Sequence, residues 1–234
     1  MNILKNIFGQ LYICFTYPFY LAFLFYRNLI VFYKNPLLLL VDIKIFFYYI
    51  FNYSLSIQRY EQEKARLKIL DDSCLIYGET PYFSLEKILD NIPVTKDSVF
   101  FDLGCGKGRL CFYVECMLNV KSFGFDLIPT YIKTANKIAT KHGFASKFIL
   151  KDIFAVDLKD VDILYVAGTC FSKEQRKKLL NKIISIRPGA WIISTSYGFD
   201  HSSLKLKKEL DCWFYWGAGK AYIYQVMAHS SNTC

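Results

Sequence analysis

Each of three successive apolar runs of the sequence ends in, or is followed by, an acidic residue. A glycine-rich loop comes directly after the first of these runs. Asp102 lies at the end of the first run, Asp126 ends the second, and Asp152 follows the third. The loop glycines are Gly104, Gly106 and Gly108. Glycines in such a loop let the backbone turn sharply and approach a ligand without interference from a Cβ atom. This spacing predicts a ligand site at one edge of a sheet.

The acids indicate a nucleoside cofactor with a cationic end. An acid about 20 residues beyond the glycines can accept from both hydroxyls of a ribose, which is the role expected of Asp126. Asp102 directly precedes the loop, where a negative charge suits the α-ammonium of S-adenosylmethionine better than a pyrophosphate. Asp152 is placed to accept from an adenine amine. The three acids favour a methyltransferase over a dinucleotide oxidoreductase, and no P-loop lysine with a following serine or threonine is present.

The elements that must position these residues alternate between short strands and helices. The expected strands are 99–103, 122–125, 145–150, 161–166, 190–196, 213–215 and 222–226, and the expected helices are 109–118, 129–141 and 173–186. This order predicts an α/β, Rossmann-like sheet of seven strands, mostly parallel and covered on both faces. The glycine turn at 217–219 predicts that the sheet ends on an antiparallel hairpin. An apolar helical segment precedes it.

Five short motifs occur in one order along the chain. They are YGET at 77–80, DLGCGKG at 102–108, LYVAGTCF at 164–171, RPGAWIIST at 187–195 and WGAGKAYIY at 216–224. With these motifs the sequence resembles the class I S-adenosylmethionine-dependent methyltransferases. Within that class it is most similar to the non-SET histone-lysine methyltransferases of the disruptor-of-telomeric-silencing type. The glycine loop is common to the whole class, whereas the YGET box is much more restricted.

The resemblance implies S-adenosyl-L-methionine as the cofactor and suggests how the residues surround it. Glu79 and Thr80 close a loop over the cofactor. Asp102 and the glycine loop hold its methionine part, Asp126 holds the ribose, and Asp152 holds the adenine together with Ile153 or Phe154. The cofactor-binding candidates are Tyr77, Glu79, Thr80, Asp102, Gly104, Cys105, Gly106, Asp126, Asp152 and Ile153.

The same resemblance indicates where the methyl acceptor enters. Phe171 forms part of a channel wall, and Tyr222 or Tyr224 borders the substrate opening. A lysine nucleophile must lose its proton before it attacks, and an apolar channel lowers the pKa of its amine. The catalytic candidates are Thr169, Phe171 and Tyr224.

One position departs from the family's pattern. The family's pair of asparagines after the fourth strand is replaced by Ala-Gly at 167–168, and Thr169 or Ser172 is left to take its place. Three functions stay open. We expect a protein-lysine N-methyltransferase. The alternatives are a methyltransferase for a lipid or other small molecule, and a catalytically silent module that binds S-adenosylmethionine.

Residues 1–57 differ from the rest of the chain because they are strongly apolar. No residue from 6 to 26 is charged, and this length is about the 20 residues that a helix needs to cross a membrane. The stretch 37–57 is nearly as apolar but contains Asp42 and Lys44, which make a second span costly. We expect a membrane anchor of one span or a helical hairpin, and the alternative is a buried helical subdomain.

The chain is therefore expected to divide into an anchor at 1–57, a linker helix at 58–73 and a methyltransferase domain at 74–234. Basic residues around the first apolar stretch favour a membrane localisation with the catalytic domain facing the cytoplasm. The net charge of +9 is shared between the flanks of the anchor and scattered lysines, which favours membrane lipid over nucleic acid as a partner. A protein is the expected substrate. The cysteines form no CxxC pair, so we expect reduced thiols and no metal site.

Overall fold

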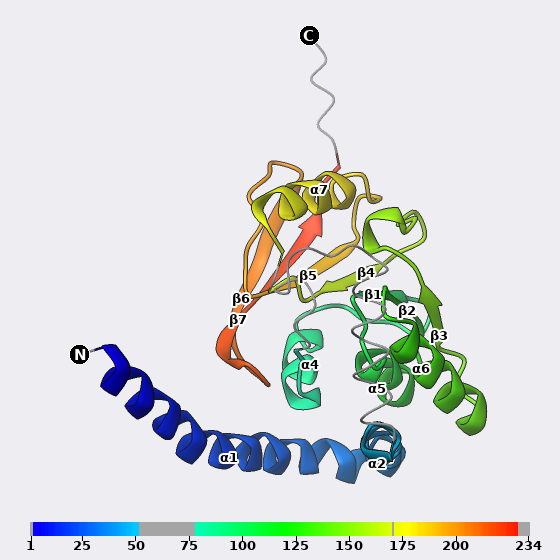
Figure 1. Ribbon diagram of the computed structural model, residues 1–234. Coiled ribbons are helices and arrows are strands. Elements are labelled where there is room, and N and C mark those ends of the chain that lie inside the picture. Colours follow the sequence, from blue (N-terminus) through cyan, green and yellow to red (C-terminus); the bar gives the residue numbers. More distant parts are fainter. Residues whose placement is uncertain (1, 52–77, 170, 229–234) are drawn as a thin grey trace.

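The computed structural model describes residues 2–51, 78–169 and 171–228, and its centre is a seven-stranded sheet (Figure 1). The strands are β1 (Val99–Leu103), β2 (Lys121–Asp126), β3 (Lys147–Leu150), β4 (Ile163–Val166), β5 (Trp191–Thr195), β6 (Leu204–Phe214) and β7 (Gly217–Val226). Their order is β3-β2-β1-β4-β5-β7-β6. Neighbours from β3 to β5 are parallel, and β7 is antiparallel to β5 and β6. The predicted Rossmann-like α/β fold with a C-terminal hairpin is confirmed.

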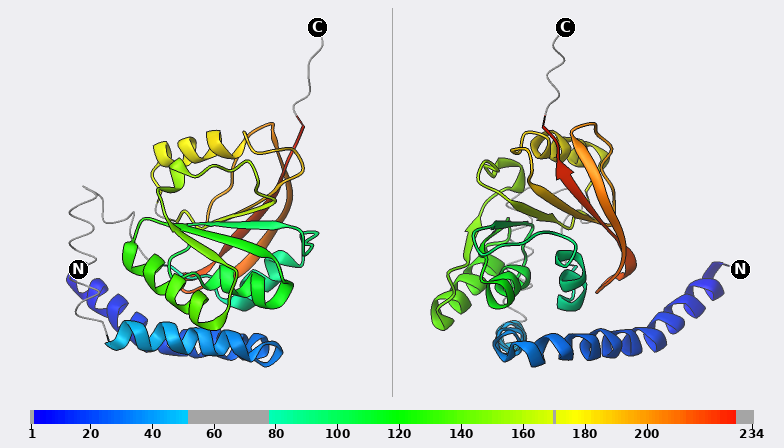
Figure 2. Two further views of the ribbon diagram at one scale, coloured as in Figure 1. Left: turned by 90° about the vertical axis from the view of Figure 1, so that its right-hand side faces the viewer. Right: turned by 180° about the vertical axis from the view of Figure 1, so that it is seen from behind.

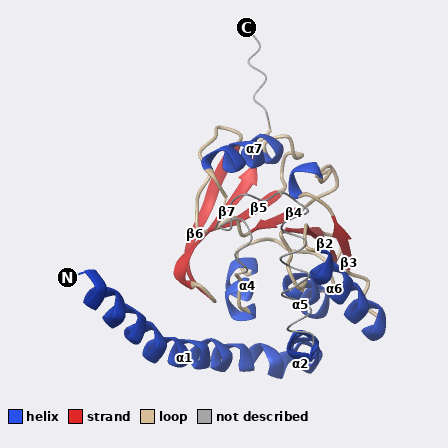
Figure 3. Ribbon diagram, viewed as in Figure 1, coloured by secondary structure: helices blue, strands red, loops and turns tan. Residues whose placement is uncertain are grey.

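Helices cover both faces of the sheet (Figure 3). They are α1 (Asn2–Lys34), α2 (Pro36–Phe51), α4 (Tyr82–Leu89), α5 (Arg109–Leu118), α6 (Pro129–His142) and α7 (Lys173–Ile183), with a 3-10 turn η2 (Ile153–Ala155). Successive residues of β1 point to opposite faces. Phe100 packs in the core formed with α4, α5 and α6, whereas Phe101 packs in the core that contains Leu179 and Ile183 of α7. Strands that are buried on both faces read as continuous apolar runs, which is why the sequence located them well.

Several boundaries differ from the sequence expectation. Strand β7 begins at Gly217 and not at 222, so the turn lies at 215–216 and the glycines expected to form it belong to the strand. Strands β3 and β4 each begin two residues later than expected. Two further differences concern β6 and α7. Strand β6 begins at Leu204, whereas the sequence predicted only 213–215. Its first half is rich in exposed lysines, which are common on edge strands because they oppose pairing with another chain. Helix α7 ends at Ile183, three residues before the predicted end. Both differences lie away from the strand edge that carries the acids.

The N-terminal helices α1 and α2 form an additional layer against α4 and α5 (Figure 2). Leu24, Val31, Leu38 and Val41 face that domain and have no exposed surface. Complete burial of such a side chain contributes roughly 1.5–3 kcal/mol relative to exposure. These buried residues therefore stabilise a helix layer that packs on the catalytic domain, while other large apolar side chains of α1 and α2 remain exposed.

This packing corrects the expectation of a membrane anchor at 1–57. Of the helices in the parts of the chain that the structure describes, none combines the length and apolarity that a membrane crossing requires. Helix α1 packs Leu24 and Val31 on the domain, and α2 has 16 residues including Asp42 and Lys44. The predicted anchor and the predicted membrane localisation, with the catalytic domain facing the cytoplasm, are therefore wrong. The linker helix expected at 58–73 and Tyr77 lie outside the described residues.

Candidate cofactor and acceptor site

The structure brings the three acids together at one edge of the sheet. Strands β3, β2 and β1 are adjacent and parallel, so their carboxyl ends lie side by side. Asp102 lies in β1, Asp126 ends β2, and Asp152 follows β3 as the N-cap of η2. The predicted clustering of the acids therefore agrees with the topology.

The glycine loop between β1 and α5 is fixed by backbone hydrogen bonds to the end of β2. The N–H groups of Gly104 and Cys105 donate to the Phe125 carbonyl at 2.8 and 3.0 Å. The Gly106 N–H donates to Oδ2 of Asp126 at 2.8 Å. Gly104 has a φ of +83°, and a Cβ atom placed there would meet no atom within 4 Å. The loop is therefore held on one side and open on the other, which leaves room for a ligand.

Asp126 connects the two loops at this edge. Its Oδ1 accepts from the Ile128 N–H at 2.8 Å, while Oδ2 holds Gly106. Burial raises the pKa of Asp126, and these backbone hydrogen bonds oppose the rise. Each carboxylate oxygen has a second lone pair, so the side chain retains acceptor capacity for a ligand hydroxyl.

Asp102 is buried without a cation. The side chain is only 2% exposed. Burial, with a smaller contribution from the nearby Asp126, raises the pKa of Asp102 to about 8. No cation from the described residues contributes to that shift. A buried carboxyl in this state would be ionised by a cationic ligand group placed beside it.

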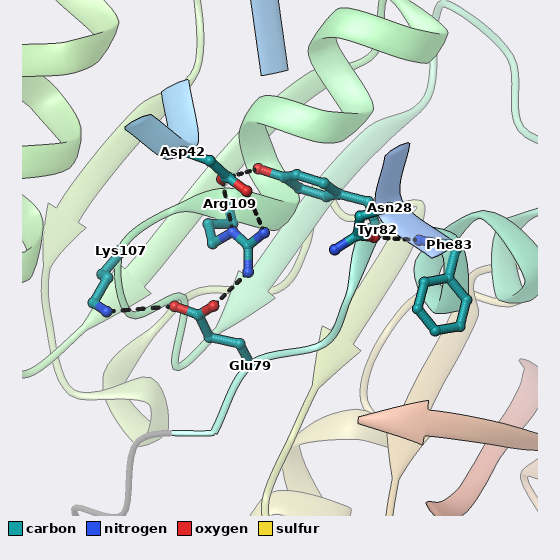
Figure 4. Close-up of polar contacts among 7 residues, drawn as sticks. All are labelled: Asn28, Asp42, Glu79, Tyr82, Phe83, Lys107 and Arg109. Atoms are coloured by element: carbon teal, nitrogen blue, oxygen red, sulfur yellow. Dashed lines mark hydrogen bonds and ion pairs between the residues drawn. The ribbon is translucent and has the colours of Figure 1, made fainter. Parts of the chain in front are cut away.

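The segment 78–80 is attached to the sheet and to the glycine loop (Figure 4). The Thr80 hydroxyl lies 2.5 Å from the hydroxyl of Tyr165 in β4, and the Tyr215 N–H donates to the Glu79 carbonyl at 3.0 Å. The Glu79 carboxylate pairs with Arg109 at the start of α5, and with Lys107 of the loop at 3.5 Å. Glu79 therefore lies beside the glycine loop, and Thr80 is held against β4. The expected closure of these two residues over the cofactor stays a prediction.

The ring of Trp216 lies so close to the backbone of residue 78 that only glycine fits at this position. A Cβ atom at this position would lie 2.6 Å from the ring of Trp216, which stacks on Phe214. Any larger residue would push the turn between β6 and β7 away from the segment 78–80.

Aromatic side chains from η2, from the segments after β4 and β5, and from β7 form two groups of neighbouring rings, which together we call the aromatic cluster. Its members are Phe154, Phe171, Tyr197, Phe199, Tyr222 and Tyr224. Neighbouring rings within it are 5.2 to 6.5 Å apart between centroids. Gly168 joins its two halves, because a Cβ atom there would lie 2.5 Å from Phe171 and 2.8 Å from the Tyr197 hydroxyl. Phe171 and Tyr197 therefore fill the space that a side chain at position 168 would occupy.

The model of the family described as a methyltransferase domain matches residues 94–229, more than half of the chain. The chain belongs to this family. It is an S-adenosylmethionine-dependent methyltransferase, and S-adenosyl-L-methionine is its cofactor.

Two curated relatives and one solved structure describe this likeness further. A protein-lysine N-methyltransferase of Saccharolobus islandicus is 25% identical over 124 residues, which cover 52% of this chain and 76% of that protein. A histone-lysine N-methyltransferase of Cryptococcus neoformans, specific for lysine-79 of H3, is 24% identical over 134 residues, covering 50% of this chain but 21% of that protein. An RNA methyltransferase from Salinibacter ruber, solved with S-adenosyl-L-homocysteine, has a TM-score of 0.54 at 19% identity, covering 63% of this chain and 93% of that chain. At that identity the solved structure shows the shared fold.

The residues of the methyltransferase fit its cofactor. The buried Asp102 has no cationic partner among the described residues, and the cofactor carries an α-ammonium. The open side of Gly104 leaves space in front of that acid. Asp152 is exposed, and its carboxylate accepts from the Phe154 N–H at 2.9 Å, which leaves further acceptor capacity at the strand edge. Ile153 beside it is buried.

The three catalytic candidates occupy different surroundings. Phe171 is half-buried within the aromatic cluster, and Thr169 is half-buried in the turn before it. Tyr224 is 3% exposed, and its hydroxyl accepts from the Phe199 N–H at 2.8 Å. Tyr224 therefore holds the loop after β5 in place from within the core and does not line a surface opening. Ser172 is the N-cap of α7, and its hydroxyl accepts from the Gln175 N–H.

Sequence reasoning missed two residues that shape the site. Arg109, 7% exposed, holds Glu79, and Asp42 of α2 holds Arg109. The signals were present: an arginine directly after the glycine loop, and a single acid within an apolar stretch. A lone charge in such a stretch indicates a partner, which here belongs to the catalytic domain.

Proposed function

We propose that this methyltransferase transfers a methyl group to an amine, and that the amine is the side chain of a lysine in a protein. The aromatic cluster beyond β4 and β5 is the observation that carries the proposal. The lysine specificity of the two curated relatives supports it, as does the order of the sequence motifs. We extend the proposal to membership of the disruptor-of-telomeric-silencing type.

Aromatic rings attract cations through the negative charge of their faces. Two rings of the cluster already do so at its outer side. Arg176 lies 4.7 Å from the centroid of Tyr197, and Nζ of Lys178 lies 4.6 Å from that of Phe154. The half-buried rings of Phe171, Phe199 and Tyr222 would guide the alkyl chain and ammonium of a substrate lysine in the same way.

The residues contribute mainly by positioning. When bound, the cofactor supplies a methyl group on a positively charged sulfur, which an amine nitrogen attacks in line as the sulfur–carbon bond breaks. Asp102 would hold the methionine part of the cofactor and Asp126 its ribose, and the aromatic cluster would orient the acceptor and exclude water. The apolar rings also lower the pKa of the substrate amine, which loses its proton to solvent before attack.

The proposal is tested by transfer of a labelled methyl group into cell extract, separated into protein, lipid, nucleic-acid and small-molecule fractions. We expect label in protein, recovered as methyl-lysine after hydrolysis. Extract whose lysines were first dimethylated chemically is the matched control and should lose most of the signal. Label confined to lipid or small molecules would contradict the proposal. Cofactor binding without transfer to any fraction would support the silent module.

A further inference from the structure

Helix α2 lies outside the region matched by the family, yet it reaches the residues of the cofactor site at two places. The first is Asp42. Its Oδ1 accepts from Nε of Arg109 at 2.9 Å, and its Oδ2 accepts from Nη2 at 2.6 Å (Figure 4). The Tyr82 hydroxyl donates to the same Oδ1 at 2.8 Å. Such a bidentate pair fixes both the position and the plane of a guanidinium.

The guanidinium that Asp42 holds also pairs with Glu79. The remaining terminal nitrogen of Arg109 donates to Oε2 of Glu79, and Nζ of Lys107 lies 3.5 Å from Oε1. Although burial opposes it, the charges of Glu79 and Asp42 raise the pKa of Arg109 well above its usual value, so the cation is permanent. A line of alternating charges thus runs from α2 through α5 to the glycine loop.

The second contact is Tyr49, seven residues further along α2 and therefore on the same side of the helix. Nζ of Lys107 lies 4.7 Å from the centroid of the Tyr49 ring. The ring also packs against Tyr131 of α6 at 6.0 Å between centroids. Helix α2 therefore contacts the glycine loop through Lys107 and the first turn of α6, the helix that follows Asp126.

The four charged groups Asp42, Glu79, Lys107 and Arg109 carry two negative and two positive charges. Without Asp42, the buried Arg109 would depend on Glu79 alone, and the group would carry a net positive charge. Arg109 and Glu79 would then no longer be held in place from α2, and the added positive charge would repel a cationic cofactor.

We propose that Asp42 is a positioning residue of the cofactor site: it holds Arg109 so that Glu79 faces the glycine loop. Docking of α2 and binding of the cofactor consequently stabilise each other, because a coupling between two sites is reciprocal. This inference rests on the proposed role of Glu79 and the glycine loop in cofactor binding.

The variants Asp42→Asn and Asp42→Glu of the full chain test the proposal by calorimetric titration with S-adenosylmethionine and S-adenosylhomocysteine. We expect Asp42→Asn to weaken binding of S-adenosylmethionine by about tenfold or more. Binding of S-adenosylhomocysteine should weaken less, because it lacks the sulfonium charge that the added positive charge repels. Asp42→Glu should recover part of the affinity.

Glu86→Gln is the matched control. Glu86 pairs with Lys34 of α1 at 2.6 Å, so this variant also removes an ion pair between the N-terminal helices and the domain, but far from the loops. Its affinities should stay within about twofold of the unchanged chain. Equal affinities for Asp42→Asn and the unchanged chain would overturn the proposal. Equal losses for both ligands, matched by Glu86→Gln, would also overturn it.

Hydrogen exchange of the unchanged chain tests the same coupling without a variant. Amides of α2 should exchange more slowly when S-adenosylhomocysteine is bound. Unchanged exchange in α2 at saturation would contradict the coupling. Failure of the unchanged chain to bind either ligand would refute the cofactor site itself and this inference with it, whereas normal binding with insensitive variants would refute only the role of Asp42.

Discussion

Asp42 and Asp102 are both largely removed from water, but their electrostatic surroundings are opposite. Asp42 makes a bidentate pair with Arg109 inside the contact between the helix layer and the domain. Asp102, at the end of the sheet, has no cation from the described residues, and burial raises its pKa to about 8. The comparison teaches that one acid is satisfied by the fold itself, whereas the other is left for a ligand that brings its own positive charge.

The largest effect on stability is expected for Arg109→Met. This change leaves the carboxylates of Asp42 and Glu79 without their shared guanidinium in a region with little access to water. Loss of one partner of a buried pair costs about 3–5 kcal/mol. Urea denaturation should show this loss in the free energy of unfolding. Arg187→Met is the control, since its exposed pair with Asp162 should contribute less than about 1 kcal/mol. Similar losses in both variants would contradict the contrast between the regions.

The next largest effect concerns cofactor affinity in Asp102→Asn. A charge-assisted hydrogen bond contributes roughly 1.5–3 kcal/mol, so the dissociation constant should rise by about 10- to 150-fold. The free energy of unfolding of the ligand-free protein should not fall, because the variant removes a carboxyl that burial disfavours. A variant that loses stability but retains affinity would assign Asp102 to the fold and not to the ligand.

A smaller effect is expected for Asp126→Ala. Loss of the contact between Asp126 and the ribose hydroxyls should weaken cofactor binding at least about tenfold. The variant also removes the hydrogen bonds that the carboxylate accepts from Gly106 and Ile128. Calorimetry of the variant measures the change directly. Undiminished affinity would show that Asp126 only connects the two loops.

A pH dependence of stability gives a separate test of Asp102. The pKa of Asp102 is about 8 in the folded protein and 3.8 when unperturbed, so the folded state binds the extra proton between these values. The melting temperature of the ligand-free chain should therefore fall, relative to Asp102→Asn, as the pH rises from about 4 to about 8. Parallel melting curves across this range would show that Asp102 does not carry the raised pKa.

Much of the strand edge could be predicted from the sequence. Acids at the ends of successive parallel strands must converge, because the carboxyl ends of such strands lie at one edge. The prediction for Asp102, Asp126 and Asp152 therefore required only the strand boundaries, which the apolar runs located.

The helix layer could not be predicted in the same way. Hydropathy counts apolar residues but does not tell which side of a helix packs on protein, so residues 1–57 were wrongly interpreted as a membrane anchor. The pairing of Asp42 with Arg109 joins residues 67 positions apart, and no local pattern specifies such a contact. The need for glycine at position 168 likewise could not be predicted, because it depends on the packing of Phe171 and Tyr197 against that position.

Proton release on cofactor binding tests the central claim most directly. At pH 7 most ligand-free molecules hold a proton on Asp102, and a bound ammonium should expel it. Titration with S-adenosylhomocysteine in buffers of different ionisation enthalpy measures this proton. The account predicts release of close to one proton per cofactor bound by the unchanged chain, and almost none by Asp102→Asn. Tight binding by the unchanged chain without proton release would contradict it.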